Sequence, residues 1–452
     1  MYWQFPPEYH PRIAFVVEQT CYTYSQLQQL IEEAQDKLPG QGELAILLCS
    51  NTLNTVVNYL ACLQKKVPVM LLQRDIDEAR LAKLATEFQP HMLIREADYH
   101  LTGYTQAEID PRVAILLSTS GSTGTAKQVV LSYDNLQANA DAIAQYLPIQ
   151  DSDITITTLP CHYSYGLSVI NTHLLKGACC VLNNDSVVSA NFWTLLKEHK
   201  ISSLAGVPYT YEMLAKLRFH QKEYPHLKYL TQAGGRMKHE ILELFADWSG
   251  KYNKPFYVMY GQTEATARMA WLDPELLRQK TGAIGRAIPG GQFTLINDSG
   301  APVIEGEGEL VYEGPNVMLG YASGRAELAS FAPQSKLKTG DLARKDGDGD
   351  YFITGRIKRF VKVFGLRISL DEVEKVLEAN DVSAKVTGKD DLLYVAIISG
   401  EADEVRNFLS KALTLHVSTI KVMKLDSFPV NANQKTDYPA LKQLFEESQG
   451  NV

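Results

Sequence analysis

The amino-acid sequence predicts an α/β protein whose larger part is built on parallel-rich sheets covered by helices. Short apolar runs typical of buried strands alternate with segments that repeat apolar residues at helical spacing, from the N-terminus to about residue 260. Strands separated by helices favour parallel pairing through crossover connections. The chain of 452 residues also exceeds the size of one simple domain, so we expect roughly two to four structural units.

The predicted elements follow one another closely in the first half of the chain. We expect helices at residues 23–38 and 52–64, and strands at residues 43–48, 67–72, 113–116, 154–157, 178–182 and 256–259. After residue 127, the apolar residues Leu136, Ala140, Ile143 and Leu147 are spaced as on one face of a helix. No catalytic group is evident before residue 110.

The composition excludes several classes of function. The formal net charge is 44 − 52 = −8, which leaves no electrostatic footprint for nucleic acid, so we expect a small-molecule partner. No apolar run approaches the roughly twenty residues of a membrane span, and the first residues do not have the pattern of a secretion signal. The six cysteines form no C-x-x-C pair, which disfavours structural zinc and favours a reduced, cytoplasmic protein.

A loop rich in glycine and hydroxyl side chains follows the strand expected at residues 113–116. It reads Thr119, Ser120, Gly121, Ser122, Thr123, Gly124, Thr125, Ala126 and Lys127. The glycines allow backbone N–H groups to turn inward and the lysine adds positive charge, which together indicate a phosphate cradle. The glycine spacing differs from that of a P-loop. Taken alone, the loop is equally compatible with a polar turn.

Three further clusters carry polar groups that suit a nucleotide and its reaction partner. His162 lies between Pro160 and Gly166, where it is compatible with a substrate pocket or with a structural role. The segment Tyr260-Gly261-Gln262-Thr263-Glu264 offers an aromatic ring for a base and a carboxylate for Mg²⁺. In Thr339-Gly340-Asp341, the carboxylate suits the hydroxyls of a ribose, and a plain turn is the alternative.

Taken in order, these segments resemble the signatures of the adenylate-forming superfamily of acyl-CoA synthetases, luciferases and peptide-synthetase adenylation domains. The matching segments are Thr119 to Lys127, Tyr260 to Glu264, Thr339 to Asp341, Gly355 to Ile368, and Lys435, and Gly234-Gly235 resembles a further landmark. Two positions depart from the family pattern, with Ala126 in place of Pro and Gln434 in place of Gly. Loss of a proline loosens a loop without removing a hydrogen-bond donor, so we expect function to survive.

The resemblance implies an enzyme that uses ATP and Mg²⁺ to convert a carboxylic acid into an acyl-adenylate, with release of pyrophosphate, and then transfers the acyl group to the thiol of CoA. It implies that the 119–127 loop holds the β- and γ-phosphates, Glu264 holds Mg²⁺, Thr263 contacts the α-phosphate, and Tyr260 stacks on adenine near Gly234 and Gly235. It also implies that Asp341 and Arg356 bind the ribose, Lys435 stabilises the adenylation transition state, and Lys362 serves the second half-reaction. Without the family, Lys435 is an ordinary solvated loop lysine.

The resemblance also implies an acyl pocket formed by His162, Tyr165, Gly166, Tyr209 and Arg236. This aromatic and partly polar set suits an aryl or modestly functionalised acyl group. A histidine at position 162 is similar to the form found in acyl-CoA synthetases, which disfavours an amino-acid substrate. Arg236 is compatible with pairing to a second polar group of the substrate and equally with a surface position.

By the same resemblance, residues 1–357 form the N-terminal adenylation domain and residues 358–452 a small, mobile α+β C-terminal domain, with a hinge near Lys358. Within this domain, Ser369 and Glu372 form a capping-box pattern that predicts the start of a helix. Two alternatives to a CoA ligase remain: a stand-alone ligase that loads a phosphopantetheine-bearing acyl carrier protein, and a catalytically idle nucleotide-binding homologue.

Overall fold

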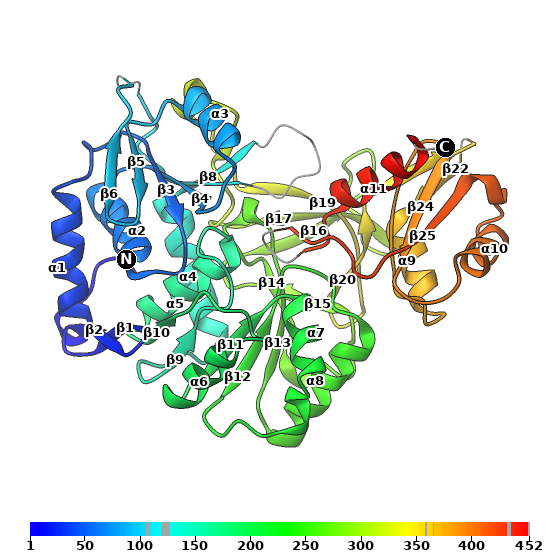
Figure 1. Ribbon diagram of the computed structural model, residues 1–452, viewed down its shortest axis with the longest axis horizontal. Coiled ribbons are helices and arrows are strands. Elements are labelled where there is room, and N and C mark those ends of the chain that lie inside the picture. Colours follow the sequence, from blue (N-terminus) through cyan, green and yellow to red (C-terminus); the bar gives the residue numbers. More distant parts are fainter. Residues whose placement is uncertain (105–107, 119–126, 358, 365, 432–434, 451–452) are drawn as a thin grey trace. The chain divides into compact units, whose positions relative to one another are not determined.

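The computed structural model describes residues 1–104, 108–118, 127–357, 359–364, 366–431 and 435–450, which divide into two compact units (Figure 1). The first unit comprises Met1–Phe293 and Tyr312–Leu337, and the second comprises Thr294–Val311 and Lys338–Val452. The expected hinge residue, Lys358, lies outside the described residues. The domain boundary expected between residues 357 and 358 therefore stays a prediction.

One sheet of the first unit has seven strands. Their order is β18 (Gly320–Ala322), β8 (Gln128–Ser132), β7 (Val113–Ser118), β4 (Val69–Gln73), β3 (Ala45–Cys49), β5 (Met92–Arg95) and β6 (Asp98–Leu101). Strands β7, β4, β3 and β5 are parallel, and helices α1 (Tyr24–Gln35), α2 (Leu53–Lys65) and α3 (Glu78–Phe88) alternate with the early strands. Thr23 and Thr52 cap α1 and α2 by accepting backbone N–H groups.

A second sheet carries most of the remaining strands of the first unit. Its order within this unit is β15 (Ala283–Ala287), β14 (Ala270–Trp271), β13 (Phe256–Tyr260), β12 (Tyr229–Gln232), β11 (Ser203–Gly206), β9 (Ile154–Ile156), β10 (Cys179–Leu182), β1 (Ile13–Val17) and β2 (Thr20–Thr23). The strands from β13 to β1 in this order are parallel. The predicted parallel-rich α/β architecture is confirmed.

Helices connect the strands of this second sheet. They are α5 (Ser164–Leu175), α6 (Ala190–Glu198), α7 (Pro208–Lys216) and α8 (His239–Tyr252), while α4 (Tyr133–Tyr146) leads from β8 of the first sheet to β9 of the second. In Figure 1, α7 and α8 lie side by side along the sheet, where α7 contacts β11 and α8 contacts β13. The connections place the carboxyl ends of the parallel strands at one edge of the sheet.

The structure differs from the sequence prediction on the carboxyl side of the Gly/Ser/Thr loop. A strand that the sequence did not predict, β8, lies between that loop and α4 and pairs antiparallel with β7. Ser118 and Gln128 are register partners, and their side chains are hydrogen-bonded at 3.0 Å. The loop thus connects two neighbouring antiparallel strands, although residues 119–126 themselves lie outside the described part of the chain.

The second unit begins with long β-strands and ends in a small α+β core. Strands β19 (Lys336–Lys345) and β20 (Tyr351–Arg356) form a hairpin, and β21 (Phe360–Val363) pairs with β22 (Leu366–Ser369). A three-stranded sheet of β23 (Ala384–Lys389), β24 (Leu392–Ile397) and β25 (Ile420–Lys424) packs with α9 (Leu370–Glu378), α10 (Ala402–Ala412) and α11 (Tyr438–Gly450). Ser369 caps α9 as predicted, accepting the N–H of Glu372.

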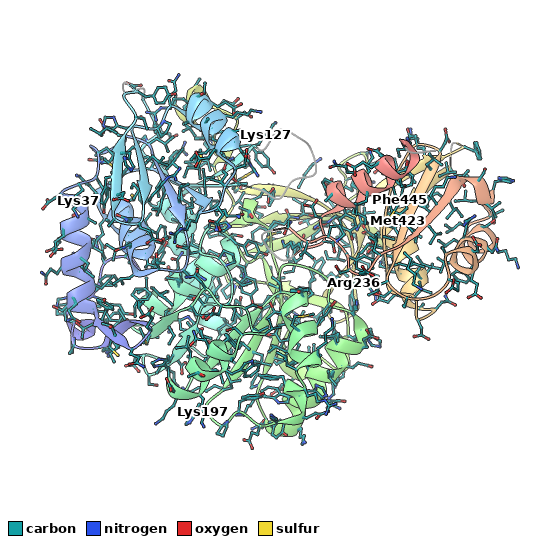
Figure 2. The ribbon with its side chains drawn as sticks, viewed as in Figure 1. Lys37, Lys127, Lys197, Arg236, Met423 and Phe445 are labelled. Carbon is teal, nitrogen blue, oxygen red and sulfur yellow. The ribbon has the colours of Figure 1, made fainter. Side chains whose placement is uncertain are left out.

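Helix α11 closes this core with apolar contacts. Phe445 stacks on Tyr394 with ring centroids 4.9 Å apart, and Met423 of β25 packs against the same cluster (Figure 2). Tyr394, Phe445 and Leu441 are buried and Met423 is partly buried, so the final helix is bound to the sheet by hydrophobic burial.

Candidate active site

Four chain segments that were singled out in the sequence follow parallel strands of the second sheet of the first unit. The register pairs Thr155 with Ser203, Gly206 with Gln232, and Gln232 with Val258, so these strands end at one edge. His162 follows β9, Tyr209 follows β11, Gly234-Gly235 follows β12, and the Tyr260–Glu264 motif begins at the end of β13. The carboxyl edge of a parallel sheet is where ligands bind in open α/β folds.

His162 lies in the turn before α5. Its Nδ1 atom is buried and has no hydrogen-bond partner among the described residues. Burial lowers the pKa of His162 to about 4, so the imidazole is neutral near pH 7 and can offer a hydrogen bond to a ligand. Gly166 packs so closely on the preceding turn that an added Cβ would lie 2.8 Å from the carbonyl oxygen of Leu159. That contact fixes the turn that carries His162.

Tyr165 is a buried residue of α5, where the sequence predicted a pocket-lining residue. Its hydroxyl lies 3.0 Å from the carbonyl oxygen of Thr231, to which it donates, and 2.9 Å from the hydroxyl of Thr231. The guanidinium of Arg268 lies over its ring, 3.7 Å from the centroid. Any contact between Tyr165 and substrate would therefore involve the ring rather than the hydroxyl.

The Tyr260–Glu264 motif lies next to this turn. The hydroxyls of Ser164 and Thr263 are 3.3 Å apart and form a hydrogen bond between the two motifs. An added Cβ on Gly261 would lie 2.8 Å from the Cα of Arg268 and would clash with the carbonyl oxygen of Ala267. Glycine is required at position 261 because no side chain fits there.

Glu264 is partly exposed and accepts a hydrogen bond of 2.9 Å from the hydroxyl of Tyr321. Its carbonyl oxygen accepts the N–H of Met318 at 2.8 Å. The described residues include no group of three or more His, Cys, Asp or Glu that could hold a metal ion by themselves. One carboxylate suits Mg²⁺ in the form in which it accompanies a nucleotide, with phosphates and water as its other ligands.

The segment after β12 approaches the first turn of α7. Gly234 has a φ of +91°, a conformation that favours glycine, and Gln232 donates to the carbonyl oxygen of Gly235 at 2.9 Å. Gly235 lies against Pro208, since an added Cβ would lie 3.3 Å from its ring. Tyr209, which follows Pro208 in the chain, is 38% exposed. Arg236 is exposed as well (Figure 2).

The second unit holds the residues predicted to bind ribose. Asp341 and Arg356 are register partners on β19 and β20, and the Arg356 Nε lies 2.8 Å from the Asp341 Oδ1. The carboxylate is buried, whereas the side chain of Arg356 is 60% exposed. Thr339 accepts the N–H of Asp341 at 3.1 Å, and Gly340 has a φ of +71° with open space around its Cα. The structure thus presents a fixed carboxylate beside a cation.

The two lysines assigned to different half-reactions also lie in the second unit. Lys362 is exposed on the β21–β22 hairpin, where its N–H donates to Asp390 at 3.2 Å. Lys435 lies next to the bridge between Val430 and Thr436, and its N–H donates to the Asn431 side chain at 3.1 Å. Gln434, which precedes Lys435, lies outside the described residues.

Of the predicted phosphate loop, the structure describes only the last residue, Lys127. Thr119, Ser120, Gly121, Ser122, Thr123 and Gly124 lie outside the described residues, as does Ala126. Lys127 is described, and its side chain is exposed directly before β8 (Figure 2). Its role in phosphate binding stays a prediction.

Sequence reasoning missed Arg268, which contacts both Tyr165 and Gly261 through the packing described above. It follows the Tyr260–Glu264 motif but is not part of it. The only available signal was an arginine inside the apolar run Ala267-Arg268-Met269-Ala270-Trp271. The sequence analysis also did not identify Tyr321 as the partner of Glu264.

Comparison with known proteins agrees with this arrangement. A family model described as AMP-binding enzyme matches residues 98–322. This match, together with the relatives and solved structures below, confirms the predicted resemblance to the adenylate-forming superfamily.

Individual relatives cover most of the chain. The long-chain-fatty-acid–CoA ligase of Salmonella typhimurium is 27% identical over 84% of this chain and 70% of its own length. The L-proline–[L-prolyl-carrier protein] ligase of Pseudomonas fluorescens is 27% identical over 97% of both. Among solved structures, the o-succinylbenzoate CoA synthetase of Bacillus subtilis with its acyl-adenylate intermediate has a TM-score of 0.80 at 22% identity, with 95% of each chain covered.

Proposed function

We propose that this protein activates a carboxylic acid with ATP and passes the acyl group to a thiol, with CoA as the acceptor. A carboxylate oxygen of the acid attacks the α-phosphorus of ATP, the bond to the β-phosphate oxygen breaks, and pyrophosphate leaves. A thiolate then attacks the acyl carbon, the bond to the AMP oxygen breaks, and a thioester and AMP result. This reaction class, predicted from the sequence, is the one that the names and bound molecules of the relatives describe.

The hydrogen bond between Ser164 and Thr263 carries this proposal. It brings the His162 turn, proposed for the acid, against the Tyr260–Glu264 motif, proposed for the nucleotide. Adenylation requires the acid and the α-phosphate within reaction distance, and such positioning supplies a large part of catalysis. The neutral imidazole of His162 can orient the acid without adding a charge that would compete for its carboxylate.

The remaining assignments follow the family pattern and the local chemistry. Mg²⁺ would supply charge neutralisation at the phosphates, with Glu264 as its protein ligand. Asp341 accepts hydrogen bonds from the ribose hydroxyls, and Arg356 keeps that carboxylate oriented. The ammonium group of Lys435 stabilises negative charge as the acid attacks phosphorus. Lys362 belongs to the thiol-transfer step. The loop ending at Lys127 holds the outer phosphates.

A second candidate differs only in the acceptor. The prolyl-carrier-protein ligase of P. fluorescens matches 97% of this chain, which favours a carrier protein bearing a phosphopantetheine arm as the thiol donor. The histidine at position 162 argues against an amino acid as the substrate of either reaction, because a neutral imidazole supplies no anion for an α-ammonium group.

Pyrophosphate exchange into ATP, measured over a panel of fatty, aromatic, dicarboxylic and amino acids, tests the proposal directly. We expect exchange with at least one acid that is not an amino acid. Supplying CoA or a phosphopantetheinylated carrier protein to the adenylate then distinguishes the two acceptors. If no acid supported exchange while the protein still bound ATP, the chain would be an idle nucleotide-binding homologue.

The structure also bears on where the protein acts. In the described part of the chain, no helix is long and apolar enough to cross a membrane. The cytoplasmic location expected from the sequence stays a prediction.

A further inference from the structure

Arg268 is a charged residue held inside the first unit. It is 2% exposed and lies between the Tyr260–Glu264 motif and β14. Its Nε donates to the sulfur of Met259 at 3.4 Å, and its guanidinium stacks on Tyr165. Sulfur is a weak acceptor, so this hydrogen bond compensates little of the cost of removing a guanidinium from water.

No carboxylate of the residues that the structure describes forms an ion pair with Arg268. The residues outside the described ranges include no Asp or Glu. A buried cation is normally paired, because an isolated charge in a low-dielectric interior is strongly unfavourable. Stacking on Tyr165 and the neighbouring hydroxyl of Tyr146 offset part of this cost without neutralising the charge, and an anion is the partner that would offset the rest.

The surrounding side chains fix the position of Arg268. The buried Asn139 and Asn316 donate to its carbonyl oxygen at 3.0 and 2.9 Å. Tyr165, on which it stacks, is fixed by its hydroxyl contact with Thr231. The cation is therefore preorganised, as groups that recognise a ligand are.

Arg268 also lies against both halves of the candidate active site. Tyr165 belongs to the turn and helix that carry His162, and Gly261 packs directly on the Cα of Arg268. The hydrogen bond between Ser164 and Thr263 connects the same two segments. An anion paired with Arg268 would therefore be part of a molecule bound in this site.

We propose that Arg268 recognises a second carboxylate of the substrate, so that the acid activated by this protein is a dicarboxylate. This inference rests on the proposed function. One carboxylate of the substrate is adenylated, and the other forms a charge-assisted, two-hydrogen-bond pair with the guanidinium, whose planar fork matches a carboxylate. Arg268, rather than the exposed Arg236, is then the residue that selects the substrate.

The wild-type protein provides the first test. Pyrophosphate exchange is measured with aliphatic dicarboxylates from malonate to sebacate and with the phthalate isomers, each beside the monocarboxylate of equal length and its own monomethyl ester. We expect at least one dicarboxylate to exceed both neutral-ended analogues by about tenfold or more in kcat/KM. Equal or better exchange with the neutral-ended acids throughout would overturn the proposal. Absence of exchange with every class of acid would instead overturn the proposed function.

Variants provide the second test. Arg268→Met keeps an unbranched apolar side chain and removes the guanidinium and its charge, and Arg278→Met is a matched control at an exposed ion pair with Asp247. With the preferred dicarboxylate, Arg268→Met should lose about a hundredfold in kcat/KM relative to the wild type. With the monomethyl ester, the kcat/KM of the variant should differ little from that of the wild type. The control should change neither. An unchanged preference in folded Arg268→Met would refute the assignment.

Stability separates recognition from a structural role. Without substrate, Arg268→Met should melt at or above the temperature of the wild type, because an unpaired buried charge is removed. The preferred dicarboxylate should raise the melting temperature of the wild type and not that of the variant. Marked destabilisation with an intact acid preference would show that the arginine is structural. If the variant failed to fold, the wild-type panel alone would decide the substrate class.

Discussion

Glu374 of α9 is the centre of a buried charge network in the second unit, and replacing it with Gln tests what holds this unit together. Its carboxylate accepts hydrogen bonds from Arg359 at 2.8 Å, Lys385 at 3.2 Å, the N–H of Val386 at 2.9 Å and the hydroxyl of Tyr438 at 3.0 Å. Its side chain is only 15% exposed. Burial raises the pKa of Glu374, but Lys385 and Arg359 together outweigh burial, so the pKa lies below its usual value.

The expected cost follows from what the substitution leaves behind. Removing one partner of a buried ion pair typically destabilises a protein by roughly 3–5 kcal/mol. Asp371 still pairs with Arg359 in the variant, through a contact of 2.6 Å, so we expect the lower end, about 3 kcal/mol. Amide hydrogen exchange of β24 should then accelerate by about a hundredfold where exchange requires unfolding of this unit.

The four tryptophans make this measurement specific. Trp3, Trp193, Trp248 and Trp271 all lie in the first unit, so their fluorescence in a urea titration should show an unchanged transition for that unit. Glu404→Gln is the matched control, because Glu404 is exposed on the first turn of α10. If β24 exchanged no faster in Glu374→Gln than in Glu404→Gln, the network would not stabilise the unit and the reasoning would be wrong.

Four further predictions concern the candidate active site. Lys435→Ala should abolish adenylate formation, measured by pyrophosphate exchange, and leave thiolysis of supplied adenylate largely intact; an equal fall of both steps would contradict the assigned role. Asp341→Asn should chiefly weaken ATP binding in calorimetry, because a charged acceptor is lost, and unchanged affinity would refute the ribose assignment. Glu264→Gln should raise the Mg²⁺ concentration needed for half-maximal exchange, since a neutral amide is a poor ligand for a hard cation, and an unaltered requirement would exclude Glu264 as a ligand. His162→Asn tests a pH effect. Burial lowers the pKa of His162 in the folded protein to about 4, below its value of about 6.5 in the unfolded chain. The contribution of His162 to stability is therefore complete above about pH 6.5 and is lost as the pH falls toward the pKa of the folded state. In urea titrations followed by tryptophan fluorescence, the wild type should therefore lose more unfolding free energy than His162→Asn over that window, and parallel losses would contradict the burial effect.

Elements whose local sequence and tertiary setting agree were predicted well. The runs at residues 43–48 and 67–72 form the strands β3 and β4, which pair in parallel. Both faces of this sheet are covered, so consecutive side chains are buried and the sequence of each strand is almost continuously apolar. Ser369 begins a helix because its hydroxyl accepts the N–H of Glu372, which lies only three residues further along the chain. Such local patterns are fully visible in the sequence.

Elements that depend on distant partners were missed. Strand β8 forms because Val129 and Val130 pair with Leu117 and Leu116, respectively, of β7. Its first residue, Gln128, is fully buried, which no propensity suggests. The charge network around Glu374 joins α9, β23 and α11, and a sequence shows only that each of its members is charged or polar.

The contrast between Asp341 and Arg268 explains why the reaction could be predicted from the sequence while substrate choice could not. Any acid activated with ATP requires the same contacts to ribose, phosphates and metal, so the residues that make them recur in fixed order and form motifs. The part of the acid that does not react differs between enzymes, and the residue that binds it has no common pattern. Arg268 is set apart only by burial without an ion-pair partner among the described residues, a property that arises when α4, α5 and β13 pack around it. A charged side chain kept in that state at a cost to stability is best explained by a ligand that repays it.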